Sequence, residues 1–279
     1  MRLVVVALVV FLASWVSPAR ADEVAPDLEG SDLRVKAQAA LKKLVNALPT
    51  NDQRRLVGLY TAFDPNVADP IAQVACDDDG DYVVLLSDAM LRLAAHVARA
   101  ATYDETTAPS TGKVEDYAAF VARSQVPGRR LLPPPPGFFV ADRPADTYEL
   151  RLAEVLSFVV ARELTHLRAG DLVCPKPTAT KESGDEVWTS SEQRKANEAA
   201  RQVYPGRQLE RDNESIVRVL EIGRSEQGGI ALLRFFSRFE LETSIANGRF
   251  APTYAAHHPS AGIRLANVIR AAEAAKKHD

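Results

Sequence analysis

Three ionisable residues, Arg162, Glu163 and His166, lie close together in the most apolar helix that the sequence predicts. From 148 to 169, leucine and valine recur at three- and four-residue spacing, and no glycine or proline interrupts until Gly170. This pattern predicts a largely buried helix. Glu163 and His166 are one turn apart and project from the same side, beside Arg162. Buried ionisable groups need a partner, a metal or a chemical role.

The chemistry suggested by this spacing is that of zinc. A histidine at position 162 would complete the string H-E-x-x-H, in which two imidazoles on one helical face hold zinc and the glutamate between them polarises a metal-bound water. Here the first of those positions is Arg162. An E-x-x-H string by itself is a weak signal, and its weight depends on the buried helix around it and on the segments that follow.

Four blocks of the sequence, in the same order, resemble a known family. They are residues 71–93, 152–170, 210–236 and 258–264. The chain resembles the gluzincin metallopeptidases that include HtpX and the CAAX prenyl proteases. The resemblance implies a zincin-like fold, α+β and predominantly helical, with a small β-hairpin or sheet bordering a substrate cleft. It also implies zinc-dependent cleavage of peptide bonds.

The resemblance assigns roles to six residues, matched motif by motif. Glu163 falls on the general base, His166 and Glu210 on zinc ligands, Glu214 on an acid behind the ligands, and His258 and Arg264 on late polar residues of the cleft. The sequence departs from the family where Asn213 replaces an alanine, where the stretch before the zinc helix is longer, and above all at Arg162.

Arginine cannot coordinate zinc. Its guanidinium has five donors and no acceptor, and it stays charged at any ordinary pH. The charge would also repel a dication, and only two protein ligands would remain where catalytic zinc usually has three and a water. We therefore expect weak or absent zinc binding. We expect the Arg162 guanidinium to stand in the place of the metal, paired with Glu163, with Glu210 or with both.

Two functions follow from this reasoning. In the first, the chain is a peptide-binding or regulatory pseudoprotease that grips an extended peptide or an unfolded protein segment along an edge strand at 82–86. In the second, it is an active zinc metalloendopeptidase with an altered metal site that recruits His96 or His257. We favour the first function, because Arg162 disables the metal site, and keep the second as the alternative. A helical exported protein without a cleft function is a third interpretation, and it requires that the candidate site residues lie far apart.

The N-terminus predicts export. Arg2 precedes an apolar run from 3 to 16 and the triplet Ala19-Arg20-Ala21, which together are typical of a secretory signal peptide at 1–21. An uncleaved anchor is the alternative. Residues 22–279 would then form a single periplasmic or secreted domain without an integral membrane segment. The formal net charge of the chain is −3, which gives no support to nucleic-acid binding. The oligomeric state is not predicted.

The remaining features concern organisation. Cys76 and Cys174 form a disulfide or remain two buried thiols. Helices are predicted at 31–48 and from 88 to about 101, and a hairpin at 71–76 and 82–86 around an acidic turn that lacks the glutamate of a calcium loop. Residues 102–147 are expected to be an irregular insertion with a brief helix at 114–123. It contains the tetraproline 133–136, a surface spacer or a docking site. Trp188, in the polar stretch 176–208, is either a lid or a surface residue.

Overall fold

The computed structural model describes residues 30–107, 112–139, 145–174, 205–245 and 259–277. The expected signal peptide at 1–21, Trp188, His257 and His258 lie outside these ranges. The described elements, in chain order, are α1 (Gly30–Asn46), α2 (Thr50–Arg55), β1 (Tyr60–Asp64), β2 (Ala72–Cys76), β3 (Tyr82–Ser87), α3 (Asp88–Thr106), α4 (Lys113–Ser124), α5 (Ala145–Arg168), α7 (Pro205–Glu221), α8 (Gln227–Ile245) and α10 (Ala261–Ala275). The described part is thus α+β and predominantly helical, as predicted.

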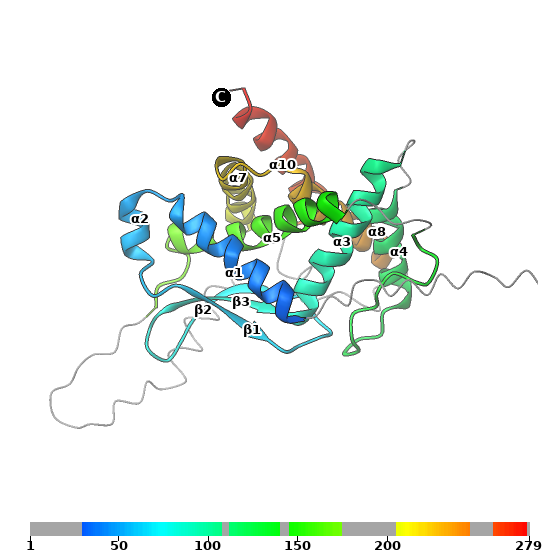
Figure 1. Cartoon of the computed structure of the whole chain (residues 1–279), viewed down its shortest axis with the longest axis horizontal. Coiled ribbons are helices and arrows are strands. Elements are labelled where there is room, and N and C mark those ends of the chain that lie inside the picture. Colours follow the sequence, from blue (N-terminus) through cyan, green and yellow to red (C-terminus); the bar gives the residue numbers. More distant parts are fainter. Residues whose placement is uncertain (1–29, 108–111, 140–144, 175–204, 246–258, 278–279) are drawn as a thin grey trace, which may run out of the picture.

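Helix α5 is the centre of the fold. Its apolar residues are buried on almost every side, as expected for a helix that is apolar around most of its circumference. It packs against α1, α3 and the sheet, and also against α7 and α8 (Figure 1). Helix α10 in turn packs against α7 and α8. The ionisable residues of α5 are therefore enclosed by helices that come from distant parts of the sequence.

In the part of the chain that the structure describes, the sheet has three strands in the order β1-β3-β2. Strands β2 and β3 form the predicted antiparallel hairpin, with Val74 opposite Val84. Strand β1 runs parallel to β3, with Thr61 opposite Val84. The sequence did not predict β1, because its five residues lack an alternating apolar pattern. In the structure only one of these five residues is buried. Since β3 is paired on both sides, the prediction that 82–86 is an edge strand is wrong.

The junction from β3 to α3 shows how local chemistry starts a helix. Ser87 is extended, and its Oγ accepts a hydrogen bond from the Met90 amide at 3.1 Å, which caps α3. The same hydroxyl donates to the Asp69 carbonyl at 2.6 Å and accepts from the Ile71 amide at 2.8 Å. One buried serine therefore fixes both the start of the helix and the end of the loop that leads into β2.

Residues 102–147 are more regular than predicted. Helix α3 continues to Thr106, and α4 spans Lys113–Ser124. Helix α4 forms because its buried face, which includes Val114, Tyr117 and Val121, packs against α3 and α8. The tetraproline itself has no helix or strand, as its composition requires. Among the described helices, none combines the length and the hydropathy of a membrane span.

Candidate functional site: a buried charge cluster between three helices

Arg162 and Glu163 of α5 form a buried ion pair. Arg162 Nη1 donates to Glu163 Oε1 at 2.8 Å. Arg162 Nη2 donates to the side-chain oxygen of Gln208 on α7 at 2.5 Å. The two ionic residues and the amide are almost wholly shielded from water. The guanidinium therefore joins α5 to α7 through its charge and its planar set of donors.

A second arginine enters this group from α10. Arg264 Nε donates to Asp212 Oδ2 at 2.7 Å and Arg264 Nη2 donates to Asp212 Oδ1 at 2.8 Å, a bidentate pair in which both side chains are 0% exposed. Asp212 Oδ1 also lies 3.4 Å from Arg162 Nε. We call Arg162, Glu163, Gln208, Asp212 and Arg264 the charge cluster. Among these described residues, two cations face two carboxylates, and buried charges need such partners.

Glu210 does not join the charge cluster. Its side chain is exposed, while Gln208 and Asp212, two residues to either side, are buried. Residues four apart share a helical face, whereas a shift of two residues turns the side chain to the opposite side. Of the alternatives left open for Arg162, the structure therefore has the pair with Glu163, and α7 contributes Gln208 and Asp212 in place of Glu210. Buried Ile216, four residues after Asp212, marks this face and could have set the helical phase from sequence.

Two other residues named from the resemblance, Arg264 and Glu214, form ion pairs between helices in the structure. Arg264, which was expected to line the cleft, is fully buried against Asp212. Glu214 is half-buried on α7 and forms an ion pair with Arg168 of α5. Asp212, which sequence reasoning missed, is the acid of α7 that approaches Arg162, at 3.4 Å.

His166 belongs to a neighbouring group of polar side chains. Its Nδ1 lies 2.9 Å from Asp171 Oδ2, and Arg211 Nε of α7 donates to the same oxygen at 2.8 Å. Gly170 has a φ of 73°, and this left-handed residue ends α5 so that the Asp171 amide donates back to the His166 carbonyl at 3.0 Å. Hydrogen bonds from His166 and Arg211 hold the pKa of Asp171 well below its usual range despite burial, which raises it.

The side chains present do not fit a zinc site of the expected kind. Of the positions that face one another, 162 carries a permanent cation and 208 carries a neutral amide, so neither supplies an anionic or imidazole donor. Within the described ranges, no three His, Cys, Asp or Glu side chains are grouped so that they could hold a metal ion. His96 lies instead on α3 with its ring 5.6 Å from that of Tyr117, and burial with nearby arginines lowers its pKa to about 4.

A disulfide lies next to the His166 group. Cys76, the last residue of β2, is bonded to Cys174, and their Cα atoms are 5.5 Å apart. Of the two alternatives that the sequence left open, the structure therefore has the disulfide. Cys174 follows Asp171 by three residues, so the bond ties the segment after α5 to the sheet. It closes a loop with a sequence separation of 98 residues, which restricts the unfolded chain.

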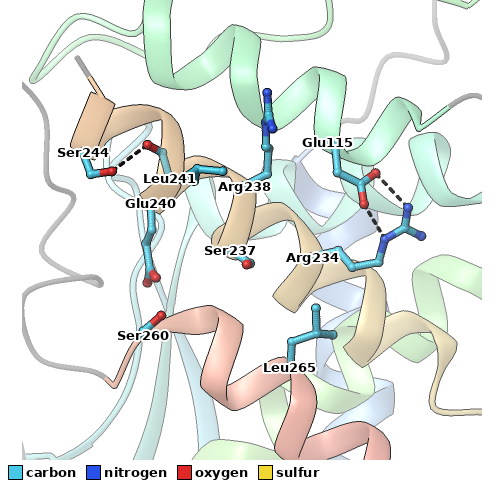
Figure 2. Close-up of a pocket in the computed structure, with 9 residues that line it drawn as sticks. All are labelled: Glu115, Arg234, Ser237, Arg238, Glu240, Leu241, Ser244, Ser260 and Leu265. Atoms are coloured by element: carbon cyan, nitrogen blue, oxygen red, sulfur yellow. Dashed lines mark hydrogen bonds and ion pairs between the residues drawn. The ribbon is translucent and has the colours of Figure 1, made fainter.

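A surface pocket of about 490 Å³ lies between α4, α8 and α10 (Figure 2). Glu115 and Arg234 form a two-point ion pair on one side of it, at 2.6 and 2.7 Å. On the other side Glu240 accepts a hydrogen bond from the Ala261 amide at 2.8 Å, and burial raises the pKa of this glutamate. Sequence reasoning did not find this pocket, because its lining comes from three separate segments without a shared motif.

Comparison with known proteins gives no family for the chain. No protein-family model matches it, and searches of curated proteins and of solved structures find no match.

Proposed function

We propose that this chain is an exported, metallopeptidase-like protein that acts by binding a peptide or an unfolded protein segment, and that it does not hydrolyse peptides with zinc. The observation that carries the proposal is the position of Arg162. Its guanidinium is hydrogen-bonded to Glu163, the residue that the resemblance makes the general base, and to Gln208 on the facing helix. Glu163 Oε1 therefore accepts a hydrogen bond from a guanidinium, where the resemblance would have it face a metal-bound water.

The charge cluster also gives Glu163 a structural role without catalysis. With Asp212, it is one of the two carboxylates that pair with Arg162 and Arg264 among the described residues. A binding protein derived from a peptidase-like fold would keep such a carboxylate to hold its helices together. Of the three described strands, β1 and β2 lie at the edges of the sheet and could accept an extended peptide, whereas β3 is paired on both sides.

The experiment is a combined test of binding, cleavage and metal content. The chain from residue 22 onward is incubated with fluorescein-labelled casein; anisotropy reports binding and gel electrophoresis reports fragments. Zinc is measured by mass spectrometry after dialysis. We expect an increase in anisotropy, intact casein and zinc well below one equivalent. Stoichiometric zinc, or cleavage that a chelator abolishes, would overturn the proposal in favour of an active metalloendopeptidase.

Variants at the two facing positions sharpen this test. Arg162→His alone should not acquire stoichiometric zinc, since Gln208 still offers a neutral amide. The combination Arg162→His with Gln208→Glu places an imidazole and a carboxylate where the guanidinium and amide now meet, and it should bind zinc more tightly than either single variant. Adding Glu210→Gln to that combination serves as the matched control. This change should leave zinc affinity unchanged, because Glu210 is exposed on the other side of α7.

A further inference from the structure

The loop between α4 and α5 holds the tetraproline Pro133–Pro136 between two anchors. Pro133 and Pro136 are exposed, and the two prolines between them are partly exposed. Consecutive prolines have φ fixed near −65° and favour the extended polyproline II helix, whose backbone has no internal hydrogen bonds. Whether such a segment serves only as a spacer depends on how firmly it is held and on what flanks it.

The first anchor is built from α4. The Gln125 amide nitrogen donates to three backbone carbonyls within 126–130, and its oxygen accepts from the Leu132 amide at 3.0 Å. The buried Tyr117 hydroxyl donates to the Leu132 carbonyl at 2.7 Å. Leu131 is buried, and its amide donates to a carbonyl of the β1–β2 loop at 2.8 Å. The chain that enters the tetraproline is therefore fixed in both position and direction.

The second anchor follows immediately. The Phe138 amide donates to the Pro135 carbonyl at 3.0 Å, and Gly137 has a φ of 75°, as in a type II turn with proline at its second position. Phe138 and Phe139 then pack edge to face, with ring centroids 4.9 Å apart. The Lys113 ammonium lies 4.6 Å from the Phe138 ring, and the Arg99 guanidinium lies 4.5 Å from the Phe139 ring.

We propose that this anchored tetraproline is a docking site for a partner protein with an aromatic-lined, proline-recognising groove bordered by acidic side chains. Aromatic grooves bind polyproline II segments because the ligand is extended before binding and loses little conformational entropy. The two anchors reduce that loss further. The acidic border is inferred from charge: Arg129 and Arg130 are exposed just before the prolines, and the partly exposed Arg92 and Arg99 lie on the neighbouring helix α3. This site is separate from the charge cluster and does not depend on the function proposed above.

The test uses the chain from residue 22 onward and a panel of isolated SH3, WW and EVH1 domains as aromatic-groove probes. Binding is measured by isothermal titration calorimetry. At least one probe should bind the natural chain, and a synthetic peptide of residues 125–139 should compete for it. The double variant Pro133→Ala and Pro136→Ala should weaken binding at least ten-fold, and Arg129→Glu with Arg130→Glu should weaken it and remove its salt dependence.

The matched control is Pro127→Ala, an exposed proline of the same loop outside the tetraproline, which should bind within two-fold of the natural chain. Circular dichroism checks that every variant remains folded. The proposal is overturned if no probe binds the natural chain, or if the tetraproline variant and the control bind equally well. Binding of the natural chain to phosphatidylserine vesicles but to no probe would also overturn it, because the arginines would then serve a membrane surface.

Discussion

Replacing Asp212 with asparagine should strongly destabilise the protein. The Asp212 carboxylate is 0% exposed and receives two hydrogen bonds from Arg264 at 2.7 and 2.8 Å, with Arg162 Nε at 3.4 Å. Asparagine has nearly the same shape but no charge. Within the described residues of the charge cluster, it would leave two buried guanidiniums and the carboxylate of Glu163. Removing one partner of a buried ion pair costs about 3–5 kcal/mol, because the remaining charge is uncompensated in a medium of low polarity.

The free energy of unfolding is measured by urea denaturation, followed by circular dichroism at neutral pH. A total stability of about 5–15 kcal/mol is typical, so a loss of this size would shift the urea midpoint visibly. The matched control is Glu210→Gln, which removes the same charge from an exposed position of the same helix. That variant should stay within about 0.5 kcal/mol of the natural chain, as surface substitutions usually do.

The comparison between Asp212→Asn and Glu210→Gln tests the helical phase of α7 as well as the energy. If Glu210→Gln were the more destabilising of the two, the assignment of 208 and 212 to the buried face would be refuted. If the free energy of unfolding of both variants stayed within about 1 kcal/mol of that of the natural chain, the charge cluster would contribute no more than an exposed ion pair does. The buried arrangement would then be refuted.

Two further predictions concern pH and packing. Burial and nearby arginines lower the pKa of His96 to about 4, against about 6.5 in an unfolded chain. Because the unfolded state binds a proton first, the free energy of unfolding falls as pH drops from 6.5 towards 4, by as much as ~3 kcal/mol. His96→Gln should flatten this part of the urea-stability profile, and parallel profiles would contradict the assignment. Gly228→Ala should cost about 1–3 kcal/mol or more in thermal unfolding, because the added carbon would lie 2.4 Å from the Val155 amide nitrogen where α8 crosses α5. Gly262→Ala, whose nearest contact would be 3.4 Å, is the control and should change stability little.

Much of the local structure could be predicted from the sequence, because it depends on short-range patterns. The apolar spacing from 148 to 169 gave α5 within a few residues, and Gly170 marked its end. The hairpin followed from two apolar runs around an acidic turn. Strand β1 and the length of α3 were missed. Strand β1 is held by its parallel neighbour β3, and the end of α3 packs against α4.

The sequence by itself determined that a buried helix carries Arg162, Glu163 and His166, and that an arginine at 162 cannot ligate zinc. Both statements rest on periodicity and on the chemistry of single side chains. Only the tertiary structure decided which residues meet that arginine. Gln208 and Asp212, not Glu210, face it, and Arg264 arrives from a helix about fifty residues further along the chain. The physical reason is that α7 buries its apolar face against α5 and α10, and this burial fixes the rotation of α7 about its axis. Two positions that differ by two residues then point to opposite sides, one into a buried ion pair and the other into solvent.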